Sequence, residues 1–291
     1  MLIDTHCHLH DREFFTEEQA EEMLARAHEK NVQKIICIGT SHQDSLVAQE
    51  FASLHPDVYW TYGIHPEYAK DGVDTKLFSA GLEFLSTSYT GARAEPPLRG
   101  EPVRPVRNIR VKNSNQDMLQ KVQYQPPIGI GEVGLDYHYD GHDRGKQIEL
   151  FEKMLQLAVD NDLPVSFHVR EAFDDFFPVV ANFPKVRGVV HSFSDNKKNL
   201  KRILTETEFF VGVNGMATYS TLPMPPLDRI LLETDAPFLT PVPFRGIINE
   251  SGYIREIAEW LSAKLAVDFD QVEQETTRNA NLLFRFDDAS V

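Results

Sequence analysis

The chain has 291 residues, enough to bury a substantial core as one large α/β domain or as two smaller ones. Its formal net charge of −15 argues against a surface that coats nucleic acid broadly, although carboxylate-rich metal sites also carry negative charge. The two cysteines cannot form a disulfide scaffold, and no apolar run approaches the roughly 18 residues of a membrane span. Because no signal-peptide pattern opens the sequence either, we expect a cytoplasmic protein without a membrane or an obligate protein partner.

Short runs rich in Val, Ile and Leu alternate with amphipathic stretches along the chain. The apolar runs predict eight strands, over residues 2–5, 34–38, 58–62, 128–131, 164–167, 188–190, 209–213 and 229–233. The stretches between and after them predict helices, including residues 17–30, 41–54, 142–162, 251–265 and 269–281. The clearest is the helix over 142–162, in which Ile148, Phe151, Leu155 and Ala158 recur at three- and four-residue spacing.

This alternation of strands and helices indicates parallel βαβ units. Eight strands match a closed (β/α)8 TIM barrel, and an open doubly wound sheet is the alternative. The barrel is favoured because its functional site gathers residues from the carboxyl ends of many strands, where this sequence places its ionisable residues. We therefore expect residues 1–291 to form a single TIM-barrel domain.

One segment interrupts the alternation. Residues 88–127 contain six of the 17 prolines, with seven basic and three acidic side chains and no convincing periodicity. A basic, proline-rich stretch of this length predicts a flexible insertion before the fourth strand, near the bottom of the barrel. A tolerated disordered loop is the simpler interpretation, and an arm that contacts nucleic acid is the alternative.

Ionisable residues stand at or just beyond the ends of six predicted strands. They are His6 and His8 in DTHCH, His65 in GIHP, Glu132 in IGEVG, His168 in SFHVR, His191 in VVHSF and Asp235 in ETDAP. Because parallel barrel strands end on one face, these side chains predict one convergent site that binds more than one metal ion.

The spacing of individual residues supports metal binding. His6 and His8 are two apart on a strand, so both rings project from one face and can chelate one ion, while Cys7 points away into the packing. Glu132 follows four residues that are all Ile or Gly, where an unpaired carboxylate would be costly to bury. A pair of cations bridged by Glu132 would satisfy it, and an ion pair with a neighbouring helix is the alternative.

The remaining strand-end residues complete a mixed set of ligands. His168 and His191 could each ligate a second cation, although either alone would more often be a core residue or a helix cap. Asp235 could ligate the first cation or act as a base, with Glu233 in a supporting position. Such a site suits zinc, manganese or magnesium. Cations there lower the pKa of a bound water and hold both the attacking and leaving oxygens of a phosphoester.

The chain resembles the TatD family of metal-dependent deoxyribonucleases, within the amidohydrolase-like barrel superfamily. The resemblance is carried by the phrases DTHCHL, GIHP, IGEVGLDY, LPVSFHVR, VVHSF, FVGVNGMATY and LLETDAPFLTPVPFRGIINE, with RNANLLF near the end. These phrases occur in family order and cover essentially the whole chain outside the insertion. The resemblance implies a TIM barrel of the metal-dependent hydrolase type with two divalent cations, Zn, Mg or Mn.

Roles for individual residues follow from the resemblance. It implies a first cation held by His6, His8, Glu132 and Asp235, and a second held by Glu132, His168 and His191. Glu132 and Asp235 would then be catalytic, together with His65, which matches a histidine that contacts the scissile phosphate or a proton in transfer.

Further residues match substrate-facing positions of the family. Asp136 would orient a ligand or the substrate, and Arg170, Arg245 and Asn249 would contact the substrate. Arginine suits phosphate because its planar fork can bind two oxygens. A structural ion pair in the loop after the eighth strand is the alternative for Arg245.

The implied function is hydrolysis of phosphodiester bonds in DNA, exonuclease-like on single-stranded or damaged DNA, in DNA repair or DNA degradation. The alternative is a small-molecule hydrolase of an ester, lactone or amide. Many barrels of that kind use a bridging carboxylated lysine, whereas the fourth strand here offers Glu132, which favours the nuclease. A metal-binding scaffold whose basic insertion contacts partners is a third hypothesis.

One further departure from the family pattern concerns the segment before the eighth strand. Residues 219–226 (YSTLPMPP) are shorter than the family segment, which carries a helix, and their prolines leave little room for one. Loss of a helix there would widen the substrate groove or alter specificity.

Overall fold

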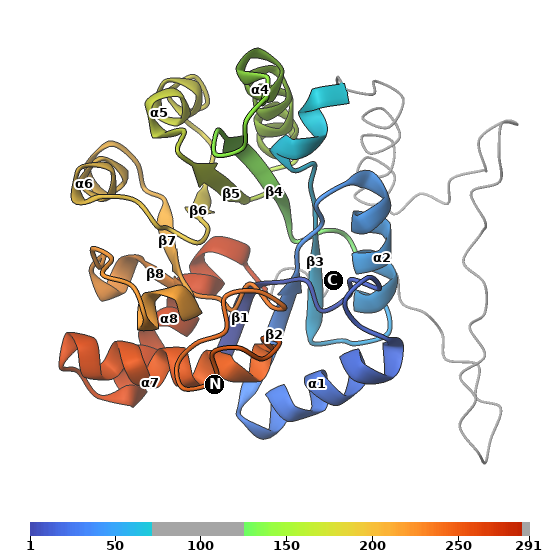
Figure 1. Cartoon of the computed structure of the whole chain (residues 1–291), viewed down its shortest axis with the longest axis vertical. Helices are drawn as coiled ribbons and strands as arrows, with labels where there is room; N and C mark the ends of the chain where they lie inside the picture. Colours follow the sequence, from blue (N-terminus) through green and yellow to red (C-terminus); the bar gives the residue numbers. More distant parts are fainter. Residues whose placement is uncertain (72–124, 287–291) are drawn as a thin grey trace, which may run out of the picture.

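The computed structural model of the chain describes residues 1–71 and 125–286. Within these residues, eight strands form one sheet in sequence order, and every neighbouring pair is parallel. The strands are β1 (Leu2–Cys7), β2 (Val32–Cys37), β3 (Val58–Tyr62), β4 (Gly129–Asp136), β5 (Val165–Arg170), β6 (Gly188–Val190), β7 (Phe210–Val213) and β8 (Ile230–Leu232). Figure 1 shows the strands arranged around a common centre with helices outside them.

Hydrogen bonds that join β1 and the residues just after it to the residues just after β8 close the ring. The Asp235 N–H, just beyond β8, donates to the carbonyl of His6 at 2.8 Å, and the His8 N–H donates to the carbonyl of Ala236 at 2.7 Å. Deeper in the seam, the buried Asp4 carboxylate accepts from the hydroxyl of Thr234 at 2.6 Å. The TIM barrel is therefore confirmed, and the open doubly wound sheet is wrong.

Helices pack around the sheet in the order that the alternation predicts. They are α1 (Glu17–Glu29), α2 (His42–Ala52), α4 (Arg144–Asp160), α5 (Phe173–Ala181), α6 (Lys197–Glu206), α7 (Ile254–Leu265) and α8 (Phe269–Phe284), with short 3-10 turns η1 (Pro66–Asp71), η2 (Gly215–Thr218), η3 (Leu227–Arg229) and η4 (Ser251–Tyr253). Capping side chains mark where helices begin. Thr16 and Gln19 form a reciprocal capping box at α1, and Asp143 accepts the Lys146 N–H at the start of α4.

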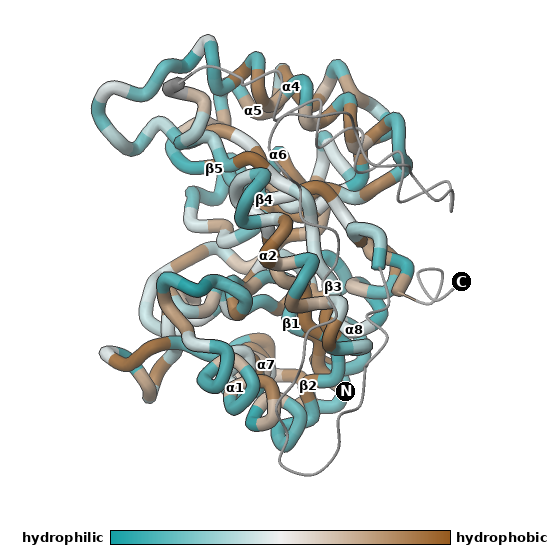
Figure 2. The backbone as a smooth tube through the Cα atoms, turned by 90° about the vertical axis from the view of Figure 1, so that its right-hand side faces the viewer, coloured by the Kyte–Doolittle hydropathy of each residue, from teal (hydrophilic) through white to brown (hydrophobic). Residues whose placement is uncertain are grey.

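The core has two parts, one on each side of the sheet. Side chains that point outward from the strands, such as Ile35, Cys37 and Phe167, pack against the helices. Inward-pointing side chains such as Ile3 and Leu231 pack against the end of α8, which fills the bottom of the barrel. Hydrophobic colours in Figure 2 accordingly gather along the central strands, while much of the outer helices is hydrophilic.

Two strands run further than the sequence predicts. β4 continues to Asp136 rather than ending at Gly131, and β5 continues to Arg170 rather than ending at Phe167. The reason is their mutual pairing, since the ladder between β4 and β5 is extended by partners such as Gly134 and His168. Glu132 and His168 therefore lie within strands, not after them.

The predicted insertion over residues 88–127 falls almost wholly outside the described part of the chain, except for its last three residues. Between β7 and β8 the structure has only the turns η2 and η3, so residues 219–226 contain no helix, as their prolines predict. In the described ranges, no helix combines the length and apolar character needed to cross a membrane.

Candidate metal centre and active site

Glu132 lies at the centre of the histidines that the strands bring together. Its Oε2 is 3.4 Å from His6 Nε2 and 4.0 Å from His8 Nε2. Its Oε1 is 2.6 Å from His168 Nδ1, 3.8 Å from His191 Nε2 and 4.0 Å from His65 Nε2. The two oxygens of one buried carboxylate therefore face two different sets of histidines.

A close backbone approach fixes the position of Glu132. The Glu132 N–H donates to the carbonyl of Gly39 at 2.6 Å. A Cβ at Gly63, just beyond β3, would lie 2.2 Å from the Gly131 carbonyl carbon and 2.3 Å from the Glu132 nitrogen. Only glycine permits the chain after β3 to pass this close, so Gly63 contributes to the site through its lack of a side chain.

Asp235 provides a second carboxylate on the same face. Its Oδ1 lies 3.5 Å from His8 Nε2, 3.6 Å from His6 Nε2 and 3.8 Å from His191 Nε2. Its φ of 58° is in the left-handed region, which non-glycine residues rarely adopt and which clusters at functional sites. The turn after β8 thus holds Asp235 opposite His6 on β1 and His8 just beyond it.

The Nδ1 atoms of His6 and His8 already have partners within the protein. His6 Nδ1 lies 3.1 Å from Ser166 Oγ, and His8 Nδ1 lies 3.1 Å from the carbonyl oxygen of Ile38. A proton on His8 Nδ1 donated to that carbonyl leaves its Nε2 lone pair facing the carboxylates. His6 Nε2 is buried and has no hydrogen-bond partner within the described chain. A cation beside Glu132 and Asp235 would satisfy it, so this donor set fits a divalent metal ion.

A comparable arrangement surrounds His168 on β5. Its Nδ1 faces Glu132, while its Nε2 lies 3.0 Å from Asp136 Oδ2. The Asp136 carboxylate also accepts the His138 N–H at 2.9 Å, which fixes its orientation. A carboxylate on one ring nitrogen and a ligand position on the other is a frequent geometry of metal-binding histidines.

Three groups of described residues bring potential ligand atoms within 4.8 Å of one another. They are His6, His8 and Glu132, then His6, His191 and Asp235, then His65, Glu132 and His168. The first group agrees with the ligand set that the resemblance implies. The second and third differ from it, because His191 groups with Asp235 and His65 takes a place beside His168.

Glu233 lies beside His191, on the buried side of the site. Its fully buried carboxylate lies with Oε1 3.1 Å from His191 Nδ1 and accepts the Ser192 N–H at 2.7 Å. Room for it depends on Gly212, where a Cβ would lie 2.3 Å from Glu233 Oε2. Glu233 Oε1 therefore lies beside the His191 ring on the side away from Glu132.

The electrostatics of the cluster favour bound positive charge. Burial disfavours the charged form of Glu132, but the charge of His191 and the hydrogen bond from His168 hold its pKa well below the usual range. Burial opposes protonation of His191 and His168, yet neighbouring carboxylates raise their pKa to about 10 and about 9 respectively. Without cations, protons on these rings balance the buried carboxylates.

His65 differs from the other histidines in charge. Burial, together with the neighbouring charge of His168, lowers its pKa to about 4. Its Nδ1 accepts the Glu67 N–H at 3.3 Å, which places the single proton of the neutral ring on Nε2. His65 therefore presents an N–H donor toward the centre of the site.

The predicted substrate contacts have unequal surroundings. Arg170 lies at the end of β5, with its Nη1 3.4 Å from Tyr139 Oη. Arg245 is exposed and stacks on Tyr219, with Cζ 3.8 Å from the ring centroid, and the described residues give it no ion pair. Both arginines thus carry charge that is open to an anionic ligand.

Asn249 does not face a substrate in this structure. It is fully buried, and its amide nitrogen donates to the carbonyl oxygens of Thr234 at 2.8 Å and Phe238 at 2.6 Å. The prediction of a substrate contact is therefore corrected, because Asn249 fastens the loop that follows Asp235.

Sequence reasoning missed the two groups that orient His6 and His8. Ser166 is two residues before His168 on β5 and so shares its face, a spacing that could have indicated it. The Ile38 carbonyl carries no such signal, because any residue type supplies one.

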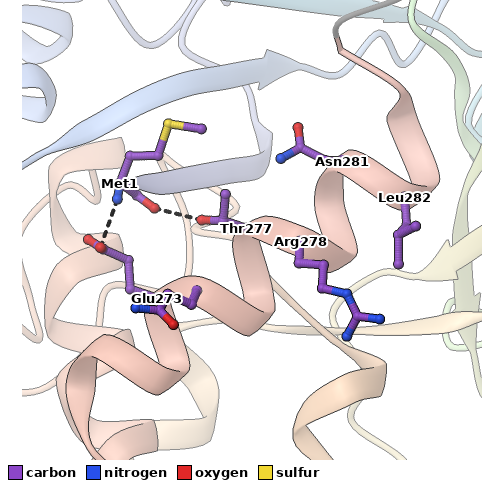
Figure 3. Close-up of a pocket in the computed structure, with 7 residues that line it drawn as sticks. Met1, Glu273, Thr277, Arg278, Asn281 and Leu282 are labelled. Atoms are coloured by element: carbon purple, nitrogen blue, oxygen red, sulfur yellow. Dashed lines mark hydrogen bonds and ion pairs between the residues drawn. The ribbon is translucent and has the colours of Figure 1, made fainter.

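A surface hollow of about 490 Å³ lies elsewhere, between the start of the chain and α8 (Figure 3). Its polar groups are largely satisfied by one another. The Met1 amino group pairs with Glu273 at 2.7 Å, and the Thr277 hydroxyl donates to the Met1 carbonyl at 2.6 Å. None of the three potential metal-binding groups lies there.

Known proteins resemble this chain in sequence and in fold. The sequence model of the family described as TatD related DNase matches residues 3–285. A relative from Bacillus subtilis (strain 168), named "Uncharacterized metal-dependent hydrolase YabD", is 29% identical over 294 residues, which cover 98% of this chain and 99% of the relative. Another, named "3'-5' ssDNA/RNA exonuclease TatD" and from Erwinia tasmaniensis, is 28% identical over 280 residues, covering 91% and 93%.

The fold also matches solved structures. The crystal structure of YjjV, a TatD homologue from Escherichia coli K12, superposes with a TM-score of 0.78 at 24% identity and covers 98% of each chain. At this identity the likeness shows the fold alone. Since the family model spans nearly the whole sequence, the family that the strand-end motifs predict is confirmed. This chain belongs to the TatD-related DNase family of metal-dependent hydrolases.

Proposed function

We propose that the chain hydrolyses phosphodiester bonds in DNA with two divalent cations held on either side of Glu132. The observation that carries the proposal is the division of its carboxylate, with Oε2 facing His6 and His8 and Oε1 facing His168. Two cations held by these residues would suit displacement at phosphorus, because they would supply positive charge to the attacking and leaving oxygens.

The ring nitrogens support a particular division of ligands. His6, His8 and Asp235 face Glu132 Oε2 and would hold the first cation together with it. His191 has its Nδ1 beside Glu233, which leaves Nε2 to join His168 at the second cation. His65 carries its proton on Nε2 and so is a donor, which suits a phosphate oxygen better than a cation.

The other residues have roles that follow from their charge. Asp235 lies at the edge of the cluster and its pKa stays below the usual range, because His191 and His8 outweigh the effect of burial. Its carboxylate is partly open to solvent and lies 3.5 Å from His8 Nε2, a position that suits the base that takes the proton of the attacking water. Arg170 and Arg245 would hold flanking phosphates through their planar donor groups.

Two considerations favour DNA over a small ester, lactone or amide. β4 supplies a glutamate at the bridging position and no lysine that could be carboxylated. The Erwinia tasmaniensis relative is named as an exonuclease on single-stranded DNA and RNA, which supports exonuclease-like action on single strands. Damaged DNA is a related substrate, since it offers unpaired bases.

The test is a metal-reconstituted assay with Zn²⁺, Mg²⁺ or Mn²⁺. Single-stranded DNA labelled at the 3′ end or at the 5′ end is compared with a generic phosphodiester and a panel of lactones. We expect stepwise shortening of the DNA, with the two labels reporting the direction. Hydrolysis of lactones without cleavage of DNA under any cation would overturn the proposal.

A further inference from the structure

Two exposed aromatic side chains meet at the rim of the site. Phe14 lies in the loop between β1 and α1, and Phe238 lies in the loop after β8. Their ring centroids are 5.2 Å apart, and the ring planes cross at 83°. Phe14 is 45% exposed and Phe238 is 46% exposed, so the contact between them leaves much of both rings open to solvent.

This aromatic pair lies next to one of the candidate metal ligands. The Phe238 ring is 6.4 Å from the ring of His8, centroid to centroid. The Phe238 N–H donates to the Asp235 carbonyl at 2.8 Å. A single tight turn therefore separates Phe238 from Asp235 along the chain. A group resting on Phe238 would therefore lie beside the reacting phosphodiester.

The charges near Phe14 indicate which part of a nucleotide fits. Asp11 and Glu13 flank the same loop and would repel a phosphate. The neighbouring Arg12 is engaged by Glu50 at 2.9 Å. A neutral flat group is therefore favoured against the two rings, whereas phosphates are favoured near Arg170 and Arg245.

We propose that Phe14 and Phe238 form a stacking subsite for the nucleobase next to the scissile phosphate. This proposal rests on the proposed phosphodiesterase function and adds the part of the substrate that is recognised. Every nucleobase has a flat face that can stack on an aromatic ring, so the subsite is tolerant of sequence. Bases within a duplex are paired and stacked on one another, so the subsite selects single strands.

The test pairs a protein change with a substrate change. Phe238→Leu keeps an apolar side chain and removes the ring. In the oligonucleotide, one nucleotide flanking the scissile phosphate is replaced by an abasic unit. We expect each change alone to lower kcat/KM by roughly five- to 150-fold, the range that base–aromatic stacking supports. The two changes together should lower kcat/KM by little more than either change alone.

The non-additive result separates stacking from a structural effect of the substitution. Equal losses from Phe238→Leu on the intact and abasic oligonucleotides would overturn the subsite. Leu282→Ala, which shortens another exposed apolar side chain on α8 at the opposite end of the barrel, should leave both rates unchanged. Phe14→Leu should follow Phe238→Leu with a loss in the same direction.

A second readout does not require turnover. In a single strand with 2-aminopurine at the flanking position, stacking on Phe238 should quench the fluorescence when the wild-type protein binds. Phe238→Leu should restore most of it. If DNA is bound and this signal does not change, the subsite is wrong while the proposed function stands. If no oligonucleotide is bound or cleaved with any cation, the proposed function itself fails.

Discussion

The two ends of the barrel have opposite chemistry. At the carboxyl ends of the strands, histidines face the buried carboxylate of Glu132 and the partly buried carboxylate of Asp235. At the other end, the last residues of α8, Leu283 and Phe284, pack among apolar side chains of the strands. The same strands thus deliver charge to one end and hydrocarbon to the other.

This difference means that one end of the barrel mainly determines activity and the other mainly determines stability. Buried charges that lack cations are costly, so the end that holds them contributes less to folding than it does to chemistry. The apolar end buries aromatic and aliphatic surface and has no such cost. Substitutions at the two ends should therefore affect different measurements.

Glu132→Ala should have the largest effect. It removes the carboxylate that faces both sets of histidines, so hydrolysis should fall by three orders of magnitude or more, roughly the loss of several kcal/mol of charge stabilisation. The measurement is kcat/KM for single-stranded DNA in reconstituted protein. Glu149→Ala, an exposed carboxylate of α4, is the matched control and should keep wild-type activity. Near-normal turnover by Glu132→Ala that a chelator still abolishes would contradict a bridging role.

Phe284→Ala, at the opposite end of the barrel, should lower stability without lowering activity. Removal of this buried ring should lower the free energy of unfolding by about 3–5 kcal/mol, measured by urea denaturation. Activity per folded molecule should change little. Leu282→Ala, two residues earlier and 57% exposed, should change stability by less than about 0.5 kcal/mol. A loss of turnover in folded Phe284→Ala would show that the two ends are coupled.

Glu233→Gln should weaken metal binding by about 10- to 100-fold, because the charge that holds His191 Nδ1 is lost. The substitution keeps the shape of the side chain in the space beside Gly212. Metal affinity is measured by titration against a competing chelator, with the thermal midpoint as a check on folding. An unchanged affinity would mean that Glu233 serves only to fasten the Ser192 backbone.

Metal removal should make stability depend on pH. Neighbouring carboxylates outweigh burial and raise the pKa of His168 to about 9 and of His191 to about 10, from 6.5 for an ordinary histidine. Their charged forms stabilise the metal-free fold fully below about pH 6.5, and this contribution is lost as pH rises through 9 and 10. Divalent cations require neutral rings and should remove this dependence. The measurement is the thermal midpoint at pH 7 and pH 9, once with chelator and once with Mn²⁺. If the midpoint changes with pH by the same amount in both conditions, the prediction is contradicted.

Much of the fold and of the site could be predicted because parallel strands deliver their ends to one face. His6, His8 and Glu132 are visible in the sequence as polar residues beside apolar runs. The ladder between β4 and β5 was not visible, so the sequence placed Glu132 after its strand. Strand pairing depends on contacts between segments, and no single run of residues reveals it.

Contacts between the loops after β1 and β8, where the barrel closes, also could not be predicted from the sequence. Phe14 and Phe238 are neighbours only because β1 and β8 meet, and more than 200 residues separate them. Asn249 was misjudged for the same reason, since its carbonyl partners become apparent only when the loop after β8 is folded. Side-chain orientation in loops therefore needed the structure.

The central claim is that the two oxygens of Glu132 hold two cations. Anomalous diffraction from crystals grown with Mn²⁺ or Zn²⁺ tests it most directly. We predict two peaks, one bonded to Glu132 Oε2 and the Nε2 atoms of His6 and His8, and one bonded to Glu132 Oε1, His168 and His191. A single peak, or two peaks that leave Glu132 without a metal contact, would contradict it.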